Sequence, residues 1–292
     1  MLRSSFFCLL FLLTAGFLPG AADPLRLAGT DLARPALEPL VAAYNRGALQ
    51  PLVLGLDGSR SGLAALRAGQ ADLALLAFGP GEHAATDGLR VVPLAYQVAV
   101  FGVAEANPLR QASLAQLAAL FGSKEPANYR QWGQVVNERS WAAKTVGLHA
   151  VANPTSLALD LFRYTALRAP ALKAEVTLHA TAAAALARVR GDETSLALLP
   201  GRPAETVGIH LLLVNRREDD VAFGPTPENI HAGDYPLRLP FSVAFRPERT
   251  AELLPALRFL FGDPVAAALA AADFVPVPEH ARQQTLRELG GS

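Results

Sequence analysis

Cysteine is nearly absent from this chain: Cys8 is the only one among 292 residues. It lies inside an apolar segment near the amino terminus, away from where a lipid-attachment cysteine stands. One cysteine excludes a disulfide framework and a site built from several thiolates. If the amino-terminal segment is removed, no cysteine nucleophile remains. A disulfide-free exported chain suits a bacterial periplasm.

An excess of charge is also missing, because 26 lysines and arginines balance 26 aspartates and glutamates. Without a basic surplus, the composition does not indicate nucleic acid or an acidic membrane surface as a partner. At 18% charged and 51% hydrophobic residues, the composition is not that of a disordered chain. The length is sufficient for two lobes, each with a core of its own.

Long hydrophobic runs are few, and the clearest one, Phe6–Leu13, is close to the amino terminus. It is shorter than the roughly 20 residues that a membrane-spanning helix needs. Arg3 precedes it and Gly20-Ala21-Ala22 follows it, which is the pattern of a cleaved signal peptide. We therefore expect residues 1–22 to be a signal peptide and the mature periplasmic chain to begin at Asp23; the alternative is an uncleaved anchor.

The sequence lacks the signatures of catalysis. Arg60 occupies the middle position of Gly58–Gly62, where a nucleophile elbow requires serine, and no phosphate loop ends in Lys-Ser or Lys-Thr. The histidines are scattered without the spacing of metal ligands: His83, His149, His179, His210, His231 and His280. The sequence predicts a binding protein rather than an enzyme, with no metal and no cofactor.

Two glycine- and hydroxyl-containing turns are the most informative segments that are present. Gly29-Thr30-Asp31 separates a strand-like run from a helix-like run at residues 35–44. Gly58-Ser59-Arg60-Ser61-Gly62 follows a strand-like run at residues 51–55 and precedes a short helix that ends at Gly69. Such turns place backbone N–H groups and hydroxyls at the positive end of a helix, which favours an oxyanion.

Strand-like and helix-like segments alternate along the rest of the chain, which predicts α/β layers. The further expected strands are residues 71–77, 91–103, 146–151, 195–199, 207–214 and 239–245. The further expected helices are residues 114–121, 155–167, 181–190, 250–261, 264–272 and 278–289. Residues 122–140 and 216–234 are expected to be loops and turns.

Seven segments stand in a characteristic order: Gly29-Thr30 with Pro35, Gly58–Gly62, Leu66–Asp72, Pro93–Val103 with Asn107-Pro108, Ser113–Phe121, Trp132-Gly133 and Tyr235–Arg238. Their order and spacing resemble those of the phosphate-type substrate-binding proteins of bacterial ABC transporters. The resemblance covers nearly the whole mature chain. It implies an α/β, two-lobed type II periplasmic binding protein fold with the ligand cleft between the lobes.

The extended runs at Val91–Val103 and Val207–Val214 can serve as the two crossings between the lobes, which predicts a division of the chain. Lobe 1 would contain residues 23–97 and a return part at residues 208–292, and lobe 2 would contain residues 98–207. The resemblance implies that a monomer with this fold captures phosphate or a related small anionic ligand and serves an ABC permease or a membrane sensor.

Six residues are candidates for ligand contact: Thr30, Ser59, Arg60, Ser61, Thr155 and Ser156. The first four belong to the two turns, and the last two precede the helix expected at residues 155–167. Each hydroxyl among them could instead simply cap a helix, and Arg60 could point to solvent.

Two departures from the family pattern bear on specificity. Leu75–Phe78 stands where the family presents polar groups, so we expect Phe78 to form an apolar wall beside the cleft. The segment Val151–Ser156 keeps a threonine but lacks the arginine and the glycine of the family. Three hypotheses remain: a receptor for phosphate or a related oxyanion, a receptor for a larger or less charged ligand, and a ligand-free sensor or scaffold that binds a protein partner. We expect free phosphate to bind weakly or not at all.

Overall fold

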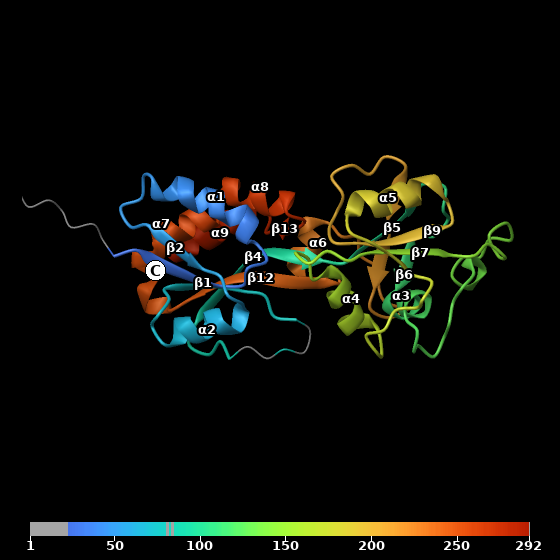
Figure 1. Ribbon diagram of the computed structural model, residues 1–292, viewed down its shortest axis with the longest axis horizontal. Helices are drawn as coiled ribbons and strands as arrows, with labels where there is room; N and C mark the ends of the chain where they lie inside the picture. Colours follow the sequence, from blue (N-terminus) through green and yellow to red (C-terminus); the bar gives the residue numbers. More distant parts are fainter. Residues whose placement is uncertain (1–22, 80–81, 83–84, 292) are drawn as a thin grey trace, which may run out of the picture.

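The computed structural model describes residues 23–79, 82 and 85–291. The expected signal peptide at residues 1–22, together with Cys8, lies outside the described residues, as does His83. The described chain forms two α/β lobes that lie end to end along the long axis of the molecule (Figure 1).

Lobe 1 is built on a six-stranded sheet with the order β13-β4-β12-β3-β1-β2. Its strands are β1 (Leu25–Gly29), β2 (Leu52–Gly55), β3 (Leu73–Leu76), β4 (Arg90–Val98), β12 (Arg238–Phe245) and β13 (Val275–Pro276). β1 is parallel to both β2 and β3, and β12 is antiparallel to β3 and β4.

Helices cover both faces of this sheet. On one face, α2 (Ser59–Arg67) packs Leu63 and Leu66 against Ala74, Leu76 and Ala244. The other face is covered by α1 (Arg34–Asn45), α7 (Thr250–Leu260), α8 (Asp263–Ala271) and α9 (Glu279–Gly290) (Figure 1). Burial on both faces explains why β3 is an unbroken run of apolar residues.

Lobe 2 contains a five-stranded sheet with the order β10-β5-β9-β7-β8. Its strands are β5 (Val100–Ala104), β7 (Gly147–Val151), β8 (Thr177–His179), β9 (Ser195–Leu199) and β10 (Ile209–Leu211). The helices of this part are α3 (Leu114–Phe121), α4 (Ala158–Ala166) and α5 (Ala182–Gly191). α3 and α4 share a core with Phe101 and Trp132, whereas α5 packs separately against Val151 and Ala197.

Smaller elements occur in both parts of the described chain. β6 (Gln111–Ser113) and β11 (Leu213–Asn215) form a two-stranded parallel sheet. α6 is a short helix, Pro227–Ala232, and two turns of 3-10 helix occur at Trp132–Gln134 and Pro247–Arg249.

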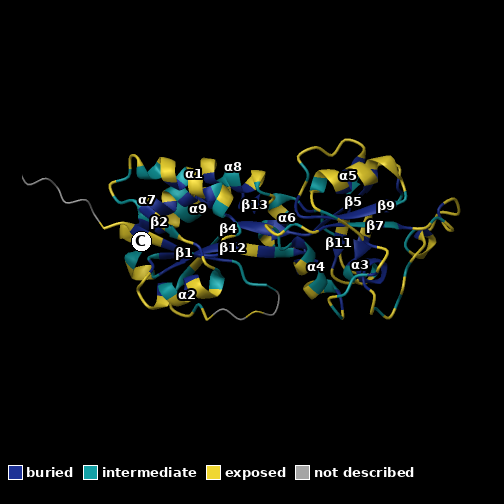
Figure 2. Ribbon diagram, viewed as in Figure 1, coloured by how far each residue is buried: buried dark blue, intermediate teal, exposed yellow. Residues whose placement is uncertain are grey.

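Two strands join the lobes. β4 continues into β5 after the single residue Ala99. β12 pairs antiparallel with β4 from Arg238 opposite Val98 to Phe245 opposite Arg90, with a register shift between Phe241 and Ser242. Both strands are largely buried (Figure 2). The Tyr235 hydroxyl donates to the Ala99 carbonyl at 2.8 Å, so this link is held by side chains as well as by the ladder.

The structure differs from the expected segments at several points. Residues from 208 onward are expected in lobe 1. In the structure, however, β10 pairs antiparallel with β5 of the lobe 2 sheet, and β11 pairs parallel with β6. β10 therefore closes an edge of the lobe 2 sheet before the chain returns through β12. α6 lies within the expected loop at residues 216–234, where Thr226 caps it and Gly233 ends it in the left-handed conformation.

No single helix within residues 23–79, 82 and 85–291 is long and apolar enough to cross a membrane. Two consecutive helical segments, Pro247–Leu260 and Asp263–Ala271, are together long and apolar enough to cross a membrane, but the pair is bent by 51°. Both helices bury apolar side chains in the core of lobe 1, Leu257 and Val265 among them.

Candidate functional site

The two glycine-containing turns meet at the carboxyl ends of β1 and β3. Gly29 has a φ of +127°, and a Cβ added to it would lie 2.0 Å from the Leu75 carbonyl oxygen. A Cβ added to Gly62 would lie 2.3 Å from the Gly29 Cα atom. Both positions therefore require glycine, and the close backbone contact fixes the start of α2 beside the end of β1.

Thr30 is used within its own loop. It is buried, its N–H donates to the Leu75 carbonyl at 2.9 Å, and its Oγ1 accepts from the Leu32 N–H at 3.4 Å. Its side chain therefore holds the entry to α1.

The predicted second turn is the first turn of a helix, since α2 begins at Ser59 rather than after Gly62. The Ser59 hydroxyl both donates to the Ala77 carbonyl and accepts from the Ala77 N–H, each at 2.9 Å. Ser61 is exposed, and its side chain has no hydrogen-bond partner in the part of the chain that the structure describes. The N–H groups of Ser59, Arg60 and Ser61 likewise have no acceptor among these residues, as is normal for a first helical turn.

Arg60 is paired with an acidic residue rather than free. Its Nη2 lies 2.7 Å from Glu82 Oε1, and Glu82 Oε2 accepts from the Gly79 N–H at 2.7 Å. The Gly79 hydrogen bond and the bond from Arg60 together lower the pKa of Glu82, so its carboxylate is charged at neutral pH. The pair cancels the positive charge that the sequence places here.

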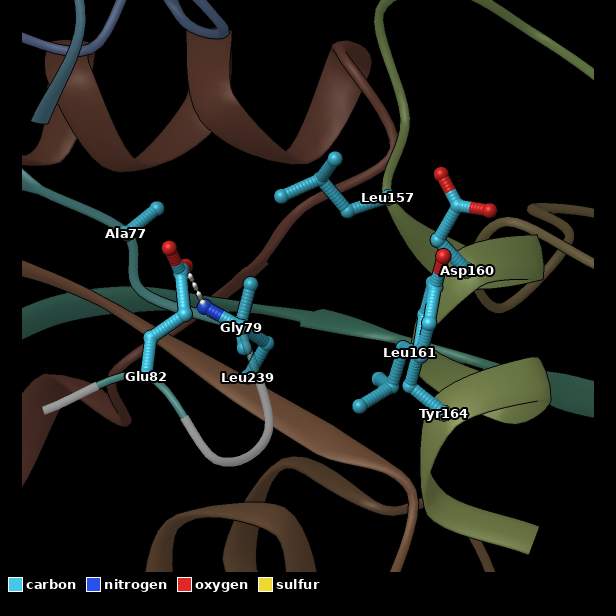
Figure 3. A pocket seen from close by; sticks show the side chains of 8 residues that line it. All are labelled: Ala77, Gly79, Glu82, Leu157, Asp160, Leu161, Tyr164 and Leu239. Atoms are coloured by element: carbon cyan, nitrogen blue, oxygen red, sulfur yellow. Dashed lines mark hydrogen bonds between the residues drawn. The ribbon is translucent and has the colours of Figure 1, made fainter. Parts of the chain in front are cut away.

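A cavity of about 280 Å³ lies between the segment that follows β3 in lobe 1 and α4 in lobe 2 (Figure 3). The described residues that line it are Ala77, Gly79, Glu82, Leu157, Asp160, Leu161, Tyr164 and Leu239. Glu82 and Gly79 lie on one wall, and Asp160, Leu161 and Tyr164 on the other. Tyr164 is 61% exposed, which leaves its ring available to a ligand.

The charged side chains in the described lining of this cavity are carboxylates, each of which is paired with an arginine outside the lining. Among the described lining residues, Glu82 and Asp160 are charged and neither lysine nor arginine is present. Glu82 is paired with Arg60, and Asp160 lies 3.3 Å from Arg163 on the same helix. Leucine and alanine side chains form most of the remaining wall, so the cavity suits an apolar body better than a bare anion.

Thr155 and Ser156 precede α4, which begins at Ala158. The Thr155 N–H and hydroxyl both donate to the Asn153 side-chain oxygen, at 2.9 and 2.8 Å. The Ser156 hydroxyl accepts from the Ala158 N–H at 3.2 Å. Both side chains thus shape the entry to the helix.

Gln97 is a polar residue of this region that the sequence motifs do not single out. It lies on β4, is 1% exposed, and accepts from the Leu157 N–H at 2.6 Å through Oε1. Its Nε2 donates to the Thr155 carbonyl at 3.3 Å. One side chain of a strand that joins the lobes therefore fixes the start of α4, and its sequence signal is a polar residue inside an apolar run.

None of the six predicted contact residues is among the described residues that line the cavity. Two of them contact lining residues, since Ser59 bonds to Ala77 and Arg60 bonds to Glu82. The expectation for Phe78 is wrong in detail, because Phe78 packs with Leu63 and Leu66 beneath α2. The apolar wall is provided instead by Leu157, Leu161 and Leu239.

Within the described residues, no group of three or more histidine, cysteine, aspartate or glutamate side chains could hold a metal ion. The described lining of the cavity thus offers apolar surface, two carboxylates and a phenol.

Comparison with known proteins identifies the fold. No protein-family model matches the chain, and no curated protein matches it. Among solved structures, a possible phosphate-binding protein from Planctomyces limnophilus is 15% identical with a TM-score of 0.66, covering 92% of this chain and 99% of that one. PstS from Borrelia burgdorferi is 13% identical with a TM-score of 0.69, covering 88% and 99%. An ABC-type phosphate transport receptor from Vibrio cholerae is 17% identical with a TM-score of 0.64, covering 87% and 99%. The chain therefore has the two-lobed fold of phosphate-type periplasmic binding proteins, as the sequence predicts.

Proposed function

We propose that this chain is a periplasmic solute-binding protein that takes a small organic ligand into the cleft between its lobes. The fold supports a binding role rather than catalysis, and the structural neighbours include a possible phosphate-binding protein and an ABC-type phosphate transport receptor. The filled receptor would then engage an ABC permease or a membrane sensor.

The observation that carries the proposal is the make-up of the interlobe cavity. A bare phosphate dianion requires many donors to offset the loss of its hydration. This cavity presents Glu82 and Asp160 instead, and the one nearby predicted cation, Arg60, is already paired. The proposed ligand is therefore larger and less negatively charged than phosphate.

The apolar part of such a ligand would lie against Leu157, Leu161 and Leu239, with the Tyr164 ring beside it. Burial of apolar surface contributes roughly 25 cal/mol per Å². If the ligand carries a carboxylate or phosphonate group, the free N–H groups of Ser59, Arg60 and Ser61 at the start of α2 are the backbone donors that we expect to bind it.

A thermal-shift panel tests this proposal on the purified protein. The panel contains phosphate, sulfate, small carboxylates, alkyl and aryl phosphonates, and organic acids with branched or aromatic bodies. A ligand that binds only the folded state raises the melting temperature at saturation. We expect a rise with an organic compound and none with phosphate or sulfate.

A cleft variant identifies the site of any hit. Tyr164→Ala removes an exposed ring from the cavity wall and should reduce the shift, because the ligand loses an aromatic contact. Val221→Ala, at a side chain that is 72% exposed and outside the cavity lining, is the matched control and should leave the shift unchanged.

A second function is favoured by one specific observation. The Ser59 hydroxyl, the Arg60 guanidinium and the Thr155 hydroxyl are all engaged within the chain, as expected of a scaffold that binds a protein partner and no solute. If no compound of the panel raised the melting temperature and the unliganded protein still bound a membrane partner, the scaffold hypothesis would be supported over the solute-binding hypothesis.

A further inference from the structure

A line of four polar side chains crosses the sheet of lobe 2, outside the cleft. Ser195 Oγ lies 3.2 Å from Asp192 Oδ2 and 3.2 Å from His149 Nε2. His149 Nδ1 in turn lies 3.1 Å from His179 Nε2. The line thus ends in two imidazole rings whose nitrogens face each other, with ring centroids 5.1 Å apart.

Parallel pairing of β7 and β8 brings the two histidines together. His149 is opposite Thr177, and His179 is opposite Val151, so the histidines are diagonal neighbours on one face of the sheet. They are 30 residues apart in the chain. Their sequence spacing therefore carries no sign of a shared site, which only the strand register creates.

Donor and acceptor arithmetic assigns the protons along the line. The Asp192 carboxylate can only accept, so the Ser195 hydroxyl donates to it. The Ser195 oxygen then accepts from the N–H at His149 Nε2. This leaves the Nδ1 lone pair of His149 facing His179, whose Nε2 proton fills the space between the rings.

Asp192 is itself fixed in place, since its Oδ1 accepts from the Thr194 N–H at 2.9 Å and from the Thr194 hydroxyl at 2.8 Å. A histidine whose second nitrogen donates toward a held carboxylate has the orientation that metal-binding histidines generally have. Here the carboxylate acts through Ser195, which is 1% exposed.

We propose that His149 and His179 form a two-histidine site for a divalent transition-metal ion, with Cu²⁺ bound more tightly than Ni²⁺ or Zn²⁺. Two nitrogens bound to one metal at about 2.0–2.1 Å are separated by about 2.9–3.4 Å when they are adjacent ligands, and the observed separation is 3.1 Å. The metal would replace the shared proton, which moves to His179 Nδ1. Water would fill the other coordination positions.

The surroundings set the strength of this site. Both imidazoles are partly exposed, and β8 is an edge strand, so an ion can approach from solvent. Asp192 attracts a cation, whereas Arg188 on α5 repels it. Imidazole suits copper, nickel and zinc, and copper is preferred among these by intrinsic affinity. With two protein ligands, we expect affinity on the order of micromolar rather than tighter.

Calorimetric titration with CuCl₂ and NiCl₂ tests the proposal on the purified protein. His149→Gln and His179→Asn should each weaken Cu²⁺ binding at least tenfold. His280→Asn, at an exposed histidine of α9, should bind as the wild type does. Electron paramagnetic resonance of the copper complex should show nitrogen ligands whose signal is lost in the first two variants.

Unchanged copper affinity in His179→Asn would overturn the proposal, as would the absence of stoichiometric binding to the wild type. If His149→Gln fails to fold, the His179→Asn variant still tests the proposal. His179 lies on an edge strand beside exposed Thr177 and Leu178, so we expect its replacement to leave the fold intact.

Discussion

Glu82 is the residue that most directly controls the charge at the mouth of the cleft. Its Oε1 atom lies 2.7 Å from Arg60 Nη2, so it pairs with that guanidinium, and it adds a carboxylate to the cavity wall. Replacing it with glutamine removes one negative charge and frees one guanidinium for a ligand. A charge-assisted hydrogen bond contributes roughly 1.5–3 kcal/mol. We therefore expect Glu82→Gln to bind phosphate at least tenfold more tightly than the wild type does, as measured by calorimetry.

The control for this prediction is Glu38→Gln, an exposed carboxylate on α1 of the same lobe. It changes the net charge by the same amount without releasing Arg60. If both variants changed phosphate affinity equally, the effect would be one of overall charge and not of the Arg60–Glu82 pair.

Lys173 makes the stability of lobe 2 dependent on pH. It is 7% exposed, and its ammonium group donates to the carbonyls of Ala119 and Tyr129 at 2.7 and 2.6 Å. Burial is the main cause that lowers its pKa to about 8, below its usual value. Because the folded-state pKa is depressed, this group's contribution to stability is complete above its unfolded pKa of about 10.4 and is lost as the pH falls toward 8.

Urea unfolding of the wild type and Lys173→Met at pH 7, 8, 9 and 10 measures this contribution. The variant removes the Lys173 donor from both carbonyls, although Ala119 keeps its bond from the Tyr129 N–H, so we expect it to be less stable by about 1–3 kcal/mol at pH 10. Its deficit should grow between pH 8 and 10. Lys124→Met, at an exposed lysine, should show no such trend, and a deficit in Lys173→Met that is independent of pH would refute the assigned pKa shift.

At the scale of elements, the close contact between β1 and α2 depends on two glycines, Gly29 and Gly62, which have no side chain. Alanine inside a helix is normally more favourable than glycine by about 1 kcal/mol. At Gly62 it would instead place Cβ 2.3 Å from the Gly29 Cα atom. We expect Gly62→Ala to lower the free energy of unfolding by about 2 kcal/mol or more, because the backbones must separate.

Gly47→Ala is the matched control, since a Cβ there meets nothing within 4 Å. It should leave the urea midpoint nearly unchanged. A Gly62→Ala protein as stable as the wild type would show that β1 and α2 can move apart freely.

Most elements of this fold can be predicted from hydrophobic periodicity and from caps. Ser113 and Gly122 bound α3 as expected, and Thr181 caps α5. β8 was missed because it is a three-residue edge strand with two exposed positions, so it lacks a buried apolar pattern. α2 begins earlier than expected because Ser59 bonds to Ala77, a partner that is distant in the sequence.

The candidate site could be predicted only in part. The turns at Gly29 and Gly58 do come together, as their shared glycine and hydroxyl pattern indicates. The pairing of Arg60 with Glu82 could not be foreseen, because it depends on the path of the loop after β3. Gln97 was visible only as a polar interruption, and its role follows from a contact 60 residues away with Leu157.

At the scale of the whole molecule, two strands join two lobes that together enclose the cavity. Leu239 of β12 lies at the cavity, and Gln97 of β4 holds the start of α4. Any ligand in the cleft therefore touches both lobes and the link between them. The chain has the fold of phosphate-type periplasmic binding proteins, while the described residues that line its cavity include no lysine or arginine.

We expect this chain not to select free phosphate, and equilibrium dialysis of the purified protein against labelled phosphate tests this most directly. The cavity offers two carboxylates and an apolar wall, and Arg60 is paired. We predict a dissociation constant above the micromolar range, or no measurable binding. Sub-micromolar binding of phosphate by the wild type would contradict the account, because the donors around the cleft would then suffice despite the carboxylates.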